Sequence, residues 1–130
     1  MNTLNLLSKK YFSSDPEEAI RISMQARELA EKIKYMPGLA LSLKNIGIGY
    51  YMQSSYLETF EYWNQSLAMY DSIGDKVGVS NIQNNIGSIY FDQGDDTKAL
   101  EYYLKSLKAA EELSDTFRIA TALGLSLIHI

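Results

Sequence analysis

Cysteine is absent from the 130 residues, and histidine occurs once, at His129. Without cysteine the chain has no disulfides, no thiolate metal ligands and no cysteine nucleophile. A single histidine cannot build the usual zinc sites of His and Cys ligands. The acidic pairs on the expected helices have no partner that indicates a raised pKa. We therefore expect no catalytic residue, no metal, no cofactor and no enzymatic activity.

Long apolar runs and an excess of basic residues are missing too. No stretch approaches the roughly 20 apolar residues of a membrane span, and the first residues lack the basic flank and cleavage site of a secretory signal. Acidic residues outnumber basic ones, 16 to 12, which gives a net charge of -4, whereas nucleic-acid-binding surfaces are basic. These features predict a cytoplasmic protein with neither nucleic acid nor a membrane as partner.

What the sequence does contain is an internal repeat. The segments 45–50 and 85–90 read Asn-Ile-Gly-Ile-Gly-Tyr and Asn-Ile-Gly-Ser-Ile-Tyr, with an offset of 40 residues. In this frame ten of the 40 positions from 41 to 80 are identical to their counterparts, where unrelated sequences share about two or three. The frame predicts three units, at about 1–39, 40–79 and 80–119, and the start of a fourth up to Gly124.

Each unit has the pattern of a helix pair. Apolar residues recur at the spacing of one helix face, as in the series Leu100, Tyr103, Leu104 and Leu107. Asp15–Glu18 resembles a capping box with proline at the first helical position, and Gly74–Asp75 and Gly94–Asp95 can end one helix and cap the next. The pattern predicts seven helices, the last one incomplete.

The third unit resembles the tetratricopeptide repeat, whose pattern asks for a Leu-Gly pair, a tyrosine, a glycine, an alanine, an aromatic residue and a small residue. The matching residues are Ile86, Gly87, Tyr90, Gly94, Ala99, Tyr103 and Ser106. The resemblance implies an all-α solenoid of antiparallel helix pairs that forms a right-handed superhelix. It also implies a scaffold that binds a peptide or a helix of a partner protein in its concave groove.

The match is looser in the other two units. The second keeps Ile46, Gly47, Tyr50 and Trp63, whereas the first has Leu7 in place of the glycine and Lys10 in place of the tyrosine. The period of 40 exceeds the usual ~34 and is similar to that of kinesin light chains, spindle-orientation adaptors and bacterial regulatory proteins. Because glycine inside a helix costs about 1 kcal/mol relative to alanine, Gly47 and Gly87 predict close approach of the paired helix.

A second stripe on the first helix of each unit lies away from the packed one and would face the groove. By resemblance to kinesin light chains, Asn5, Asn45 and Asn85 would hydrogen-bond the backbone of an extended peptide; alternatively, each asparagine bridges neighbouring helices. Chaperone-tail binders have a basic clamp at positions that here hold other residues: Leu4, Ser8, Ile48 and Ser88. This difference disfavours a carboxylate-terminated ligand. The candidate groove residues are Asn5, Lys44, Asn45, Ile48, Asn81, Asn84, Asn85 and Ser88.

The last residues do not follow the repeat. The frame predicts Asn-Ile-Gly at 125–127, where the chain has Leu-Ser-Leu, and residues 125–130 resemble a translated sequencing adapter. We exclude them from the fold, which makes the chain a fragment truncated after Gly124. The alternative function is therefore a sensory or regulatory segment of a bacterial histidine kinase or nucleotide cyclase. Self-association through the truncated end is a further prediction.

Overall fold

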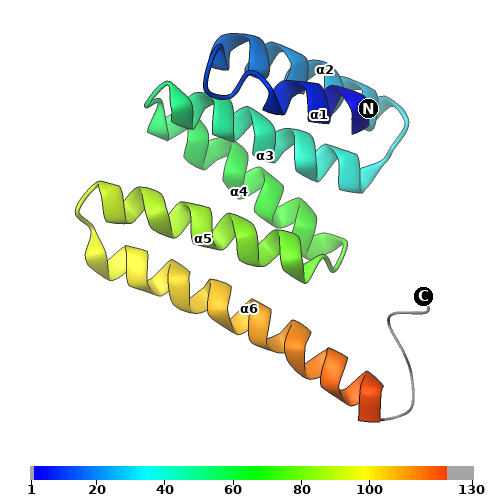
Figure 1. Ribbon diagram of the computed structural model, residues 1–130, viewed down its shortest axis with the longest axis vertical. Helices are drawn as coiled ribbons and strands as arrows, with labels where there is room; N and C mark the ends of the chain where they lie inside the picture. The colour runs from blue at the N-terminus through cyan, green and yellow to red at the C-terminus, as the bar shows by residue number, and fades with distance from the viewer. Residues whose placement is uncertain (1, 123–130) are drawn as a thin grey trace. The chain divides into compact units, whose positions relative to one another are not determined.

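The structure is a computed structural model that describes the backbone of residues 2–122 and the side chains of residues 2–115. The described residues form six α-helices and no strand, so the predicted all-α class is confirmed (Figure 1). The chain divides into two compact units, one up to Gly74 and one from Asp75 onward. The helices are α1 (Asn2–Lys9), α2 (Pro16–Lys32), α3 (Met36–Met52), α4 (Tyr56–Ser72), α5 (Lys76–Asp92) and α6 (Asp96–Ala122).

The first unit contains α1 to α4, and α3 lies in the middle of it. Helix α3 packs against α1, α2 and α4, and its Ile46 is completely buried. Two side chains of α4 also donate hydrogen bonds to backbone carbonyls of α3: Ser66 Oγ to Ala40 at 2.7 Å and Trp63 Nε1 to Lys44 at 3.0 Å. These bonds fix the position of α4 along α3.

The mid-helix glycines of α3 lie where neighbouring helices come close, as was predicted for Gly47. A Cβ atom on Gly47 would lie 2.2 Å from Trp63 Cδ1, and one on Gly49 would lie 2.5 Å from Cγ1 of Ile20 on α2. Both distances are far inside van der Waals contact, so α3 needs glycine on both of these faces. The neighbour at Gly47 is the indole ring of Trp63.

The second unit reproduces the α3–α4 packing 40 residues further along the chain. A Cβ atom on Gly87 would lie 2.9 Å from the Tyr103 ring, which is the counterpart of Trp63. Ser106 Oγ donates to the Ser80 carbonyl at 2.8 Å, as Ser66 does to Ala40. The repeat in the sequence is thus a repeat of specific interhelical contacts.

Most of the predicted helix ends are also observed. Asp15, Asp75 and Asp95 each accept a hydrogen bond from the backbone N–H three residues later, at 3.0–3.1 Å. Gly74 and Gly94 take φ values of 73° and 81° between helices, a conformation that glycine adopts without steric cost. The capping box at Asp15 is only half formed, because the Glu18 carboxylate pairs with Arg21 and the Asp15 N–H donates to the Tyr11 carbonyl.

The seventh helix that the repeat pattern predicts is not separated from the sixth within the described residues. Helix α6 continues from Asp96–Ala122 without interruption, so a seventh helix does not begin within the described residues. Ser114 stands 40 residues after Gly74, and serine lacks the access of glycine to positive φ that would favour a turn there. Residues 123–130, including the predicted adapter-derived tail, lie outside the described residues, and the repeat boundaries remain predictions.

Candidate functional site

Two of the predicted groove residues meet between α1 and α3. Asn5 and Asn45 are each only 1% exposed, and Asn45 Nδ2 donates to Asn5 Oδ1 at 3.2 Å. Asn45 Nδ2 also lies 3.4 Å from Ser8 Oγ, which itself donates to the Asn5 carbonyl at 2.8 Å. At this position the asparagines bridge neighbouring helices, which was one of the two alternatives; ligand binding by the same residues remains a prediction.

The amide pair leaves one donor and one acceptor without partners. Asn5 Nδ2 and Asn45 Oδ1 are both buried, and neither has a hydrogen-bond partner. A buried polar group left in this way costs about 1–3 kcal/mol of folding free energy. Buried polar atoms in native structures are generally paired. The two unmatched atoms of this asparagine pair therefore make it a candidate binding site.

A cavity of about 270 Å³ lies beside the asparagine pair. Its wall is formed by one stripe of α1 and by a leucine of α3: Asn2, Asn5, Leu6, Lys9 and Leu41. The α1 residues follow the spacing of a single helix face. The cavity therefore combines apolar walls with amide groups and one cationic side chain, which is the mixture typical of small binding sites.

Lys44 adds a second positive charge to this region. It follows Leu41 by one turn on α3 and is half-buried. Burial lowers the pKa of Lys44, and the positive charge of Lys9 lowers it further. Among the described residues neither lysine has an ion-pair partner. The α1–α3 face thus carries two cations that act on one another and have no counter-ion.

The remaining predicted site residues are divided between the units. Ile48 is half-buried in the first unit, whereas the other four lie on α5 of the second. Ser88 is engaged there: its hydroxyl donates to the Asn84 carbonyl at 3.1 Å and accepts from Tyr103 Oη at 3.1 Å. Asn81 and Asn84 are exposed, and Asn85 and Ser88 are half-buried.

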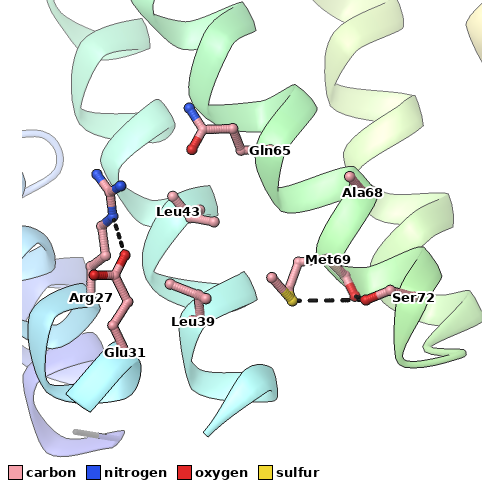
Figure 2. A pocket seen from close by; sticks show the side chains of 8 residues that line it. All are labelled: Arg27, Glu31, Leu39, Leu43, Gln65, Ala68, Met69 and Ser72. Carbon is pink, nitrogen blue, oxygen red and sulfur yellow. Dashed lines mark hydrogen bonds and ion pairs between the residues drawn. The ribbon is translucent and has the colours of Figure 1, made fainter. Parts of the chain in front are cut away.

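A larger cavity of about 450 Å³ lies elsewhere in the first unit, among α2, α3 and α4 (Figure 2). Leu39 and Leu43 form a buried apolar floor, with Met69 and Ala68 beside it. Three of its polar side chains have partners nearby: Arg27, Glu31 and Ser72. Arg27 Nε pairs with Glu31 Oε1 at 3.0 Å, and Ser72 Oγ donates to the Met69 carbonyl at 2.8 Å. We regard the α1–α3 cavity as the better candidate because there the polar atoms are unmatched.

Sequence reasoning identified the asparagines but missed their neighbours in the cavity. Asn2, Leu6 and Lys9 were not predicted as site residues, although Asn2, Asn5, Leu6 and Lys9 stand at i, i+3, i+4 and i+7. That spacing is the signal in the sequence that could have identified these three residues. It did not reveal that the charges of Lys9 and Lys44 act on one another, because this requires the packing of α1 against α3.

The described part of the chain contains no group of three or more His, Cys, Asp and Glu residues that could hold a metal ion. No described helix combines the length and the apolar character needed to cross a membrane.

Comparison with known proteins identifies the type of fold. A family model described as "Tetratricopeptide repeat" matches residues 38–112. The crystal structure of the TPR domain of Arabidopsis FLU superposes with a TM-score of 0.75 at 22% identity, covering 85% of this chain and 93% of that one. At this identity the likeness concerns the fold alone. No curated protein matches the sequence.

Proposed function

Because the chain belongs to the tetratricopeptide-repeat family, we propose that it is a scaffold that binds an extended segment of a partner protein along α1 and α3. Members of this family generally serve as protein–protein interaction scaffolds and typically lack catalysis of their own. The family does not determine the ligand, which has to be inferred from the site.

The observation that carries the proposal is the unmatched pair of atoms on Asn5 and Asn45. One amide N–H donor and one amide carbonyl acceptor are the complement of a single peptide group, which offers one carbonyl and one N–H. The peptide groups of a helix are already bonded within the helix, so the pair favours an extended segment over a helical one. Asn5 forms part of the cavity wall, so a segment that enters the cavity contacts this residue.

The test is selection of peptides from a randomised decapeptide library displayed on phage, followed by affinity measurement. We expect enriched peptides whose affinity falls at least about fivefold in the double variant Asn5→Ala plus Asn45→Ala, because two neutral hydrogen bonds contribute about 1–3 kcal/mol together. Removing both amides avoids the greater cost of leaving one without its partner.

Asn64→Ala is the matched control, because Asn64 is exposed on α4 and its loss leaves the α1–α3 face intact. Circular dichroism and urea unfolding check that each variant is folded. Equal affinity of the folded double variant and the wild type contradicts the proposal. So does the absence of enriched peptides.

The finer expectations about context stay predictions. A position within a bacterial histidine kinase or nucleotide cyclase and a cytoplasmic location were both expected from the sequence, and the described residues do not test either. Self-association has one observation in its favour. Three leucines on one stripe of α6 are more than half exposed: Leu100, Leu104 and Leu107, at 58%, 54% and 54%.

A further inference from the structure

The α1–α3 cavity has a charge that nothing in the described chain neutralises. Lys9 lies in its wall, and the pKa of Lys44, lowered mainly by burial, is also lowered by the Lys9 charge. The other charged pairs in the described residues, such as Arg27–Glu31 and Lys76–Glu112, join neighbouring cations and anions at 3.0 Å. What distinguishes Lys9 and Lys44 from other unpaired lysines is that Lys9 lines a cavity beside an unmatched amide, and that Lys44 is half-buried one turn from Leu41 in the same wall.

An anion near both lysines would change this arrangement in three ways. It would offset the repulsion between the two ammonium groups, give each a charge-assisted hydrogen bond, and offer an acceptor to Asn5 Nδ2, which has none. Leu6 and Leu41 line the same cavity. They suit the aliphatic stem that carries a side-chain carboxylate.

We propose that the cavity receives the carboxylate of an Asp or Glu side chain in the bound segment, with Lys9 in the cavity wall and Lys44, one turn from Leu41, as its cationic partners. Asn5 donates to it through one of its two Nδ2 hydrogens, and the other remains for the peptide carbonyl. This inference rests on the proposed function and specifies the ligand. The source of the carboxylate is an internal side chain rather than the end of a chain, because Leu6 and Leu41 offer apolar surface to the methylene stem that a terminal carboxylate lacks.

The test uses three synthetic pentapeptides at low salt, about 10 mM, where electrostatic attraction is little screened. They are acetyl-Ala-Gly-Glu-Gly-Ala-amide, the same peptide with Gln in place of Glu, and the Gln peptide with a free terminal carboxylate. Nuclear magnetic resonance follows the ε-methylene signals of Lys9 and Lys44 and the side-chain amides of Asn5 and Asn45. The Glu peptide is expected to shift these signals and to bind about tenfold or more tightly than the Gln peptide, the ratio that one charge-assisted hydrogen bond supplies.

Charge variants identify the residues responsible for the preference. Lys9→Gln plus Lys44→Gln should remove the difference between the Glu and Gln peptides. Lys32→Gln is the control, because Lys32 is an exposed lysine on α2, and it should leave the difference unchanged. A difference that survives in the folded double variant, or equal binding of the Glu and Gln peptides by the wild type, overturns the inference. A preference for the free terminal carboxylate overturns the assignment to a side chain.

The outcomes separate this inference from the proposed function. If the Glu and Gln peptides bind equally and both shift the Asn5 and Asn45 amides, backbone capture stands and the acid preference fails. If the Glu preference depends on the lysines but survives Asn5→Ala plus Asn45→Ala, the acid preference stands, whereas backbone capture and the role of Asn5 as a donor to the carboxylate both fail. If no peptide shifts any of these signals, both are wrong.

Discussion

Replacement of Gly47 by alanine tests the account of how α3 and α4 pack. The new Cβ atom would lie 2.2 Å from Trp63 Cδ1 and 2.3 Å from Trp63 Nε1. The indole is only 3% exposed, and its Nε1 donates to the Lys44 carbonyl at 3.0 Å. The ring therefore cannot move aside without disturbing buried packing and this hydrogen bond.

The expected change in the free energy of unfolding is the sum of two destabilising contributions and one stabilising contribution. Overpacking of a buried site costs about 1–3 kcal/mol, and loss of the Trp63 hydrogen bond costs about 0.5–1.5 kcal/mol. Alanine in a helix is favoured over glycine by about 1 kcal/mol. Gly47→Ala should therefore lower the free energy of unfolding by about 0.5–3.5 kcal/mol, although helix propensity alone predicts an increase.

The assay is urea unfolding followed by circular dichroism and by the fluorescence of the single tryptophan. Gly87→Ala provides a graded comparison, because its Cβ atom would lie 2.9 Å from the Tyr103 ring and should cause a smaller loss. If Gly47→Ala stabilises the protein by the ~1 kcal/mol that helix propensity gives, the contact with Trp63 does not restrict this position. A larger loss of stability in Gly87→Ala than in Gly47→Ala would contradict the order of the two distances.

Three further predictions concern charge, capping and self-association. Burial and Lys9 lower the pKa of Lys44, so the unfolded chain binds that proton more tightly and wild-type stability rises with pH between the lowered value and the ordinary 10.5. Lys44→Gln should lack this part of the rise, and equal pH slopes of the urea midpoints would contradict the assignment. Asp75→Ala removes the hydrogen bond from the Gly78 N–H at 3.0 Å; it should cost about 0.5–2 kcal/mol of unfolding free energy, and a loss below that range in urea melts would count against the cap. The exposed leucines of α6 predict concentration-dependent association that Leu104→Glu weakens, and a wild type that sediments as a monomer at high concentration would show this to be wrong.

Much of the fold could be predicted from the sequence because its signals are local or repeat. Helix periodicity, the capping aspartates and the turn glycines act over a few residues, and each was read correctly at Asp75 and Gly94. The expected seventh helix is not separated from α6 within the described residues, for a related reason. An aspartate can cap a helix, but a preceding residue must also leave helical geometry, and Ser114 does not do so.

The candidate site was only partly predictable. The repeated asparagines were visible in the sequence, but the burial of Asn5 and Asn45 depends on how closely α1 approaches α3. The same holds for the mutual effect of Lys9 and Lys44, which are 35 residues apart in the sequence. Contacts between helices are set by side-chain packing rather than by local pattern, so they appear only in the folded chain.

The most direct test of the central claim is to map a phage-enriched peptide onto the protein by nuclear magnetic resonance. The largest signal shifts should fall on the side-chain amides of Asn5 and Asn45, on the backbone amides of α1 and on the facing turns of α3. The signal of the side-chain amide of Gln65, which lines the larger cavity, should not shift. Large shifts at Gln65 and Ala68 with none at Asn5 would place the peptide among α2, α3 and α4 and contradict the account.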